Sequence, residues 1–361
     1  MQARFHVFSG TGNTMHAAKQ FGALLGEHGF QSEILEIDRH AEPPGQARDL
    51  EIFMFPVYAT GVPQLMQAYL RRFRDGGQVR AAVISVNGRI SLKFRDGYEG
   101  QAPLQARRIL KRRGYDVFLT DTLDYPHNIT NFIPPSRQSK QEAIIDLAQT
   151  WLVSITNRLA RGERSIRKCH ILNQAWTWVF NLLYIHIGRR FMGKLFIADA
   201  KCNACGTCAR VCPAGAIRMA RRRPRWNWSC QGCERCINIC PRRAIQTSAV
   251  RLIALIAACF YNPLYTAGRL IPHAVHKALG PSGWSIANLF LGAVCYLVFI
   301  YLLDKVLFLL QMIPGLRRVL ELSHTSLFGR YQAPGFAPRE VILTKEPGAG
   351  RRWWARITGR F

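Results

Sequence analysis

The stretch Cys202-Asn-Ala-Cys205-Gly-Thr-Cys208-Ala-Arg-Val-Cys212-Pro213 returns 28 residues later as Cys230-Gln-Gly-Cys233-Glu-Arg-Cys236-Ile-Asn-Ile-Cys240-Pro241. The repeat continues beyond the prolines, because Ala216-Ile217 is matched by Ala244-Ile245. A repeat this regular implies two copies of one structural unit, related by a pseudo-twofold axis.

The spacing of the thiols indicates their chemistry. Four thiolates at this spacing suit a cubane [4Fe-4S] cluster, and the fourth cysteine of each run then binds the other cluster. Zinc sites use pairs of C-x-x-C and have no use for a third cysteine three residues further on. Eleven cysteines in 361 residues are also too few for a disulfide scaffold. The pattern resembles that of bacterial two-cluster ferredoxins. It predicts one cluster on Cys202, Cys205, Cys208 and Cys240, and a second cluster on Cys230, Cys233, Cys236 and Cys212.

The first 160 residues alternate between predicted strands and predicted helices. Strands are expected at 4–8, 33–37, 50–57, 78–86 and 115–120, and helices at 14–26, 63–73, 104–113 and 138–159. Residues 50–57 are nearly all apolar, which is typical of a parallel strand buried on both faces. Five strands that alternate with helices predict an α/β domain, with a doubly wound parallel sheet between two helical layers.

A short loop between the first strand and the first helix can hold a phosphate group. Its glycines let the backbone approach an anion, and the positive end of the helix attracts it. The spacing matches neither the dinucleotide pattern nor a Walker loop. It resembles the FMN-phosphate loop of flavodoxins, which implies the strand order 2-1-3-4-5 and a flavin at the switch point of the sheet. The residues of this loop are Ser9, Gly10, Thr11, Gly12, Asn13 and Thr14.

Two further loops lie at strand carboxyl ends, where open α/β sheets bind ligands. The resemblance implies that Tyr58 stacks on the flavin ring and that the turn after strand four brings backbone amides to the edge of the ring. Ordinary turns of an α/β domain are the alternative. The residues concerned are Pro56, Val57, Tyr58, Ala59, Thr60 and Gly61 in one loop, and Asn87 and Gly88 in the other.

Taken together, the chain resembles a flavodoxin–ferredoxin fusion of the iron–sulfur flavoprotein type. This resemblance covers residues 1–247. We expect a flavodoxin-like FMN domain at 1–160, a basic and aromatic connecting helix within 161–196, and a small α+β ferredoxin-like domain at 197–247. A helical, membrane-associated hairpin at 248–331 and a basic tail at 332–361 complete the expected organisation.

The membrane prediction depends on two apolar stretches and on charge. Residues 284–303 carry no formal charge over twenty positions, enough for one crossing, while Asn262, Pro263 and Arg269 interrupt the stretch 252–272. Basic flanks outside the two stretches favour a cytoplasmic location for both ends. Residues 171–187, with their tryptophans, fit the membrane interface. The alternative is a soluble helical extension packed on the ferredoxin domain.

Charge divides the chain in two. Residues 1–160 hold 19 Lys and Arg against 15 Asp and Glu, and residues 161–361 hold 30 against 7. The basic half suits anionic lipid or an acidic redox partner. Nucleic acid is not expected, because no recognised nucleic-acid-binding motif is present. The chain opens without the apolar run of a signal peptide, and clustered cysteines favour thiolates in a reducing cytoplasm. We therefore expect the protein at the cytoplasmic side of the membrane, or alternatively in the cytoplasm.

The predicted function is electron transfer between FMN and two [4Fe-4S] clusters. Cofactors of this kind carry the chemistry, while the protein places and tunes them. No nucleophile–base pair or carboxylate dyad is visible in the sequence. One alternative is a membrane-bound oxidoreductase that reduces a quinone or another small substrate at FMN. Another is a structural or maturation subunit of a larger redox complex. The sequence leaves the oligomeric state open.

Overall fold

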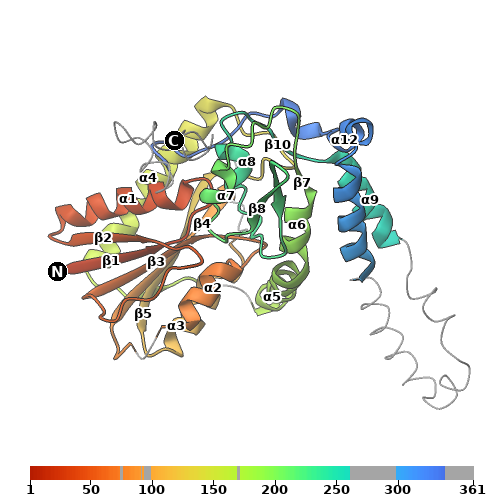
Figure 1. The fold of residues 1–361 in the computed structure, drawn as a ribbon. Coiled ribbons are helices and arrows are strands. Elements are labelled where there is room, and N and C mark those ends of the chain that lie inside the picture. The colour runs from red at the N-terminus through yellow and green to blue at the C-terminus, as the bar shows by residue number, and fades with distance from the viewer. Residues whose placement is uncertain (74–75, 91, 93–98, 169–170, 261–297, 338–361) are drawn as a thin grey trace, which may run out of the picture.

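The computed structural model describes residues 1–73, 76–90, 92, 99–168, 171–260 and 298–337 (Figure 1). A parallel sheet forms the N-terminal domain, with the strand order β2-β1-β3-β4-β5-β6. The order predicted for the first five strands is therefore confirmed. The strands are β1 (Gln2–Val7), β2 (Gln31–Glu36), β3 (Leu50–Pro56), β4 (Arg80–Arg89), β5 (Asp116–Pro126) and β6 (Ser165–Ile166).

The sixth strand, β6, was not predicted. It is two residues long and pairs Ser165 with Leu119 and Ile166 with Thr120. A strand of two residues has no hydrophobic period, so only its pairing with β5 defines it. The strand β5 also extends six residues beyond the predicted end at Thr120.

Helices cover both faces of the sheet (Figure 1). Phe21 and Leu25 of α1 share one apolar core with Leu152 of α4, while Met66 of α2 and Leu110 of α3 belong to a second core on the opposite face. The strand β3 is buried from Leu50 to Phe55, as its apolar sequence predicts. The helices are α1 (Asn13–Glu27), α2 (Gln64–Arg71), α3 (Ala102–Lys111) and α4 (Gln138–Ala160).

The cysteine-rich region folds as two copies of one unit. Helices α7 (Thr207–Arg210) and α8 (Arg235–Ile239) begin 28 residues apart, and so do β8 (Ile217–Ala220) and β10 (Ile245–Thr247). Strand β10 pairs with β7 (Phe196–Ala198), and β8 pairs with β9 (Arg223–Trp226). Left-handed backbone conformations repeat at the same interval, at Gly206 and Glu234, and at Gly215 and Arg243.

Helical segments connect and follow these domains. The connection consists of α5 (Ile171–Leu183), a π-helical turn η1 (Tyr184–Gly188) and α6 (Arg189–Leu195). After the cysteine region come α9 (Ala249–Phe260), the helical residues 298–310, α12 (Pro314–Leu320) and the turn η2 (His324–Leu327). Within the described ranges, no helix is both long and apolar enough to cross a membrane. Most of the two apolar stretches on which the membrane prediction depends, 252–272 and 284–303, lies outside those ranges.

Candidate functional site

The structure brings the eight repeated cysteines together as the two predicted sets. Cys202, Cys205, Cys208 and Cys240 line one cavity. Burial raises the pKa of Cys208 to about 12, and the neighbouring thiols of Cys240, Cys205 and Cys202 add to this shift. Thiols bind a metal as thiolates, so iron binding to this set would release these protons.

The second set lies deeper in the molecule. Burial raises the pKa of Cys230 to about 12 and that of Cys233 to about 11, and it also raises the pKa of Cys236. Cys212, from the first run, is a neighbour of all three thiols. The fourth cysteine of each run therefore lies near the first three cysteines of the other run, as the predicted exchange of ligands requires.

Hydrogen bonds to sulfur follow the repeat. The amide of Ala216 donates to Cys212 Sγ and the amide of Ala244 donates to Cys240 Sγ, both over 3.3 Å. Such bonds to ligand sulfurs are one means by which proteins set cluster potentials. Within the described ranges, no group of three or more His, Cys, Asp or Glu side chains is arranged to hold a single metal ion. The thiolates of a cubane bind four separate irons, so they lie further apart than the ligands of one ion.

The loop that carries Cys233 lies directly against the predicted phosphate loop. A Cβ atom on Gly10 would lie 2.5 Å from the Cys233 carbonyl oxygen, so only glycine permits this approach. The buried Arg235 guanidinium donates from Nε to the Gly10 carbonyl oxygen at 3.0 Å and from Nη2 to the Ser9 carbonyl oxygen at 2.5 Å. The same side chain forms an ion pair with Glu36 at the end of β2.

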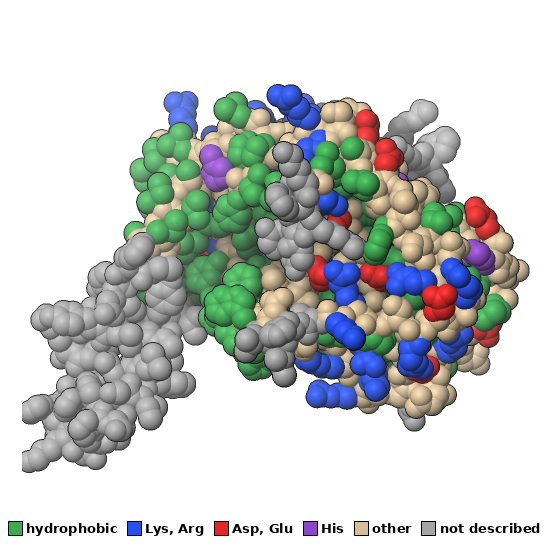
Figure 2. All heavy atoms as spheres, turned by 180° about the vertical axis from the view of Figure 1, so that it is seen from behind, with side chains coloured by type: hydrophobic (Ala, Val, Ile, Leu, Met, Phe, Trp, Pro, Cys, Tyr) green, Lys and Arg blue, Asp and Glu red, His purple; other side chains and the backbone are tan. Residues whose placement is uncertain are grey.

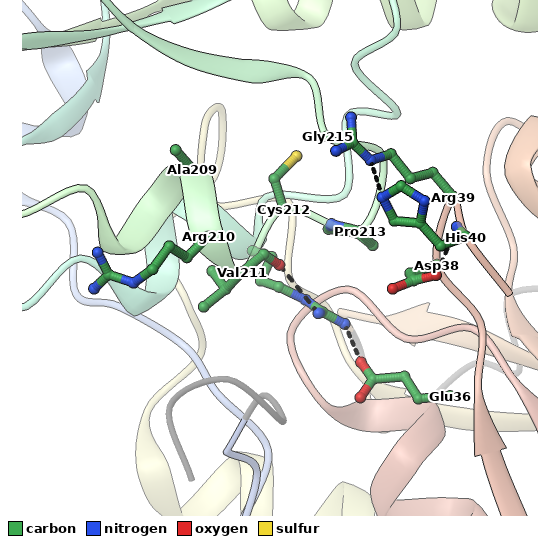
Figure 3. Close-up of a pocket in the computed structure, with 11 residues that line it drawn as sticks. Glu36, Asp38, Arg39, His40, Ala209, Arg210, Val211, Cys212, Pro213 and Gly215 are labelled. Carbon is green, nitrogen blue, oxygen red and sulfur yellow. Dashed lines mark hydrogen bonds and ion pairs between the residues drawn. The ribbon is translucent and has the colours of Figure 1, made fainter. Parts of the chain in front are cut away.

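Arg235 also borders an open cleft between the two domains. Glu36 and Asp38 lie on one side of this cleft, and Val211 and Cys212 lie on the other (Figure 3). Its Nη1 donates to the Val211 carbonyl oxygen over 3.2 Å, next to the cluster-two ligand Cys212. Across the cleft, the Arg39 guanidinium packs against Gly215, where a Cβ would lie 2.0 Å from Nη1. Arginine side chains from both domains therefore surround the approach to Cys212.

The adjacent residue, Glu234, forms a second connection between the domains. Thr130 Oγ1 donates to its carboxylate at 2.9 Å and the Asn131 amide donates to it at 3.1 Å. Burial raises the pKa of Glu234 to about 8, although the hydrogen bonds from Thr130 and Asn131 oppose this shift. Glu234 has a left-handed backbone conformation, which its counterpart Gly206 adopts without the strain of a side chain.

The phosphate loop offers unpaired backbone donors. Residues Ser9 to Thr14 are all buried, and Gly12 has a φ of 106°. Among the hydrogen bonds of the described residues, none is donated by the main-chain amides of Gly10 to Thr14. Buried amides without partners are costly, and an anion at the start of a helix would satisfy them. The loop therefore fits the phosphate of FMN.

A segment from the C-terminal region covers this loop. Tyr331 Oη donates to Asn13 Oδ1 at 2.5 Å, and the Ala333 amide donates to the Thr11 carbonyl oxygen at 3.0 Å. Phe336 packs on Gly12 so closely that a Cβ there would lie 2.5 Å from it. Asn13 Nδ2 donates to the Pro126 carbonyl oxygen. Residues 331–336 therefore close the outer side of the loop.

Polar atoms without partners also gather around the carboxyl ends of β3, β4 and β5. Buried and without a hydrogen bond are Asn87 Oδ1, both amide atoms of Gln101 and His127 Nδ1. They belong to one connected region, because Asn87 Nδ2 contacts Glu99 at 3.3 Å and the Gln101 amide donates to the Thr60 carbonyl oxygen. Gly88 packs on His127. A flavin ring has several polar edge atoms that such groups can bind.

The other predicted flavin residues lie around the same edge of the sheet. Tyr58 pairs with Gly61 through a two-way backbone bridge, and Asn181 of α5 donates to the Tyr58 carbonyl oxygen at 3.0 Å. The Tyr58 ring meets Phe8 edge-on, and its buried hydroxyl lies without a hydrogen bond near Gly10 and Cys233. The loop residues Pro56, Val57, Ala59 and Thr60 are half-buried beside it.

Several residues of this site were missed by the sequence reading. Glu234 and Arg235 stand where the first run has Gly206 and Thr207. That departure from the repeat was the available signal for a role peculiar to the second run. No pattern in the sequence pointed to Gln101.

Comparison with known proteins gives one family match and several similar solved structures. Residues 194–241 match the 4Fe-4S dicluster domain family. A flavodoxin from Streptococcus pneumoniae TIGR4 is 15% identical, with 45% of this chain and 99% of that chain covered and a TM-score of 0.32. A Pseudomonas aeruginosa flavodoxin variant is 17% identical over 44% and 97% of the two chains, with a TM-score of 0.32. Rubredoxin oxygen:oxidoreductase from Desulfovibrio gigas is 14% identical over 44% and 37%, with a TM-score of 0.27.

Comparison with curated proteins gives no match. The flavodoxin-like arrangement is established by the strand order of the sheet, and FMN agrees with the unpaired donors of its phosphate loop. The clusters follow from the dicluster match and from the two sets of thiols. The chain is therefore a fusion of a flavodoxin-like domain with a 4Fe-4S dicluster ferredoxin domain, a combination that supports a role in electron transfer.

Proposed function

We propose that this protein passes electrons between FMN and two [4Fe-4S] clusters within a single chain. The observation that carries the proposal is the contact between the Cys233 loop and the phosphate loop at Gly10. Arg235 fixes that contact through the Ser9 and Gly10 carbonyl oxygens. The loop that would bind the second cluster therefore lies in direct contact with the loop that would bind the flavin phosphate. Electron transfer between these two cofactors would need no diffusional encounter between separate proteins.

The residues around the flavin site would have separate roles in binding FMN. The amides of Gly10 to Thr14 would hold the FMN phosphate, and the unpaired groups of Asn87 and Gln101 would bind polar atoms of the ring. Bound FMN supplies the ability to exchange either one or two electrons, whereas each cluster exchanges one. Residues 331–336 would keep water from the phosphate side of the site.

The two clusters differ in their surroundings. Glu234, Arg235 and Tyr58 surround the ligands of cluster two, whereas Cys202 and Cys205 of cluster one lie half-buried at the cavity near the surface. Cluster two is therefore the neighbour of FMN, and cluster one is the cluster that exchanges electrons with an external redox protein. Exposed Arg221, Arg222 and Arg242 favour an acidic partner at that surface.

We also propose that the protein works at the cytoplasmic face of a membrane. Trp176 and Trp178 of α5 are 69% and 52% exposed, and Ile253 of α9 is 65% exposed. Hydrophobic side chains gather over the half of the molecule that holds the C-terminal helices, and charged side chains gather over the other half (Figure 2). Exposed tryptophans beside basic residues are typical of helices that lie in a membrane interface.

Cofactor stoichiometry on anaerobically purified full-length protein tests the relay. We expect about eight irons and eight acid-labile sulfides per chain for two cubane clusters, with one FMN. Stepwise reduction followed by visible absorption should then bleach flavin and cluster bands in one protein. Eight irons without flavin would refute the relay. The membrane location predicts sedimentation with membranes that survives a high-salt wash, and release by salt alone would refute it.

A further inference from the structure

The side chain of Tyr58 has a buried polar end, although the residue as a whole is only half-buried. Its hydroxyl is closed to solvent and has no hydrogen-bond partner among the described residues. A buried hydroxyl without a partner is destabilising, and native structures nearly always provide one. Since the described chain offers no acceptor, we expect a bound group to supply it.

The neighbours of the hydroxyl show in which direction it points. A Cβ atom on Gly10 would lie 3.1 Å from Tyr58 Oη and 3.4 Å from Cys233 Cβ, so both side chains reach the same point of the phosphate loop. Cys233 and Glu234 are also among the charged groups that act most strongly on the hydroxyl. The Tyr58 hydroxyl therefore faces the loop that would bind the second cluster.

Contacts on the backbone and on the ring hold Tyr58 in this position. Its amide and its carbonyl oxygen both pair with Gly61, at 3.0 and 3.1 Å, and Asn181 donates to the same carbonyl oxygen. Phe8 meets the ring edge-on, with 6.2 Å between the ring centroids. The part of the side chain that is not buried remains available for the predicted stacking on the flavin ring.

The first cysteine run supplies a hydroxyl of its own at the corresponding place. Cys205 Sγ lies 3.5 Å from Thr207 Oγ1, and once Cys205 binds iron as a thiolate, the hydroxyl becomes the donor. In the second run, Cys233 corresponds to Cys205, but Arg235 stands in place of Thr207. The Arg235 guanidinium binds carbonyl oxygens of the phosphate loop instead. The second run contains no hydroxyl residue, and Tyr58 brings one to Cys233 from the other domain.

We propose that the Tyr58 hydroxyl donates a hydrogen bond to a sulfur of the second cluster, at the Cys233 thiolate or a sulfide beside it, and so raises the reduction potential of that cluster. Reduction adds negative charge to a cluster, so a donor to its sulfur stabilises the reduced form more than the oxidised form. This proposal deepens the relay proposed above and rests on it for the second cluster. Tyr58 would then favour the passage of an electron from the flavin to that cluster.

Potentiometric titration followed by electron paramagnetic resonance tests the proposal on the full-length, anaerobically purified protein with its cofactors. Tyr58→Phe keeps the ring and removes only the hydroxyl. We expect reduction of the second cluster to become about tenfold less favourable, a decrease of about 59 mV for a one-electron couple. Fluorotyrosine at position 58 should raise the same potential, because fluorine makes the phenol more acidic and a stronger donor. A merely structural role of Tyr58 would not produce shifts of opposite sign.

The matched control is Thr207→Val, which removes the corresponding hydroxyl of the first run. It should lower the potential of the first cluster and leave the second unchanged, so it also assigns the two signals. An unchanged potential of the second cluster in Tyr58→Phe would overturn the proposal, and so would a shift of the flavin couple in its place. Fluorotyrosine keeps the hydroxyl and tests the sign of the effect even if Tyr58→Phe loses a cluster; a decrease in potential there would also overturn the proposal. Cluster potentials can be measured without flavin, so a failure of this hydrogen bond stays distinct from a failure of the relay.

Discussion

Replacing Gly10 by alanine would insert a methyl group between two cofactor-binding loops. A Cβ at this position would lie 2.5 Å from the Cys233 carbonyl oxygen and 3.1 Å from Tyr58 Oη. The carbonyl is a backbone atom, so the Cys233 loop must retreat by about 0.9 Å to restore an ordinary van der Waals contact. Gly10 does not have a left-handed backbone, so the strain comes from this contact alone.

The cost of Gly10→Ala follows from the behaviour of overpacked interiors. Added methyl groups in well-packed regions typically cost about 1–3 kcal/mol. For domains of this size, each kcal/mol lowers the midpoint of thermal unfolding by about 2–4 °C, so the expected decrease is about 2–12 °C. The displaced loop carries a cluster ligand and touches the phosphate loop. We therefore expect lower FMN retention after gel filtration and an altered spectrum of the second cluster.

The matched control is Gly26→Ala near the end of α1, where an added Cβ meets nothing within 4 Å. Alanine is favoured over glycine in a helix by about 0.5–1 kcal/mol, so this variant should melt at the wild-type temperature or above. Thermal unfolding of the loaded protein, followed by circular dichroism and by cluster absorbance, compares the three proteins. A Gly10→Ala protein that melts, retains FMN and absorbs like the wild type would refute direct contact between the loops.

Three further changes test other parts of the site. Cys240→Ser should damage the cluster held by Cys202, Cys205 and Cys208, although Cys240 lies in the second run. Electron paramagnetic resonance of the reduced protein would identify the altered cluster. Damage to the other cluster would contradict the predicted exchange of ligands between the runs. Phe336→Ala should accelerate FMN release several-fold by opening the outer side of the phosphate loop, as measured by recovery of flavin fluorescence. An unchanged release rate would show that residues 331–336 do not retain the flavin. Burial lowers the pKa of His6 below its usual 6.5, so the folded protein keeps His6 neutral and its stability falls as the pH decreases below 6.5. His6→Gln should reduce the loss of unfolding free energy between pH 7 and pH 5 by at most about 1.4 kcal/mol per pH unit, as measured from unfolding midpoints. An unchanged slope would assign the decline in stability to other groups.

The sequence predicted those features that depend on local patterns. The apolar stretch 50–57 identified a central strand, and the glycines between the first strand and the first helix marked the phosphate loop. The cysteine repeat predicted both sets of thiols, because the two runs have the same spacing and therefore the same local fold. Predictions of this kind need only the residues within a single structural unit.

Contacts between units could not be predicted in this way. Arg235 meets Ser9 and Gly10 across more than 220 residues, and Tyr331 meets Asn13 across 318. No periodicity links such positions, because their proximity depends on how complete domains pack. The two-residue strand β6 escaped prediction for the same reason, since only its neighbour β5 defines it.

The two glycines of the phosphate loop have a packing role in addition to the anion-binding role that the motif predicts. The sequence argument explained Gly10 and Gly12 by the approach of an anion to their amides. In the structure, their Cα sides are filled by the Cys233 carbonyl and by Phe336. Amide and Cα hydrogens point in different directions, so one glycine can serve an anion on one side and a packed chain on the other. A side chain at position 10 would therefore separate the loop from Cys233 even if its amide still bound phosphate. Gly10 therefore permits the Cys233 loop to lie against the phosphate loop, and the proposed relay depends on this contact together with phosphate binding by the same loop.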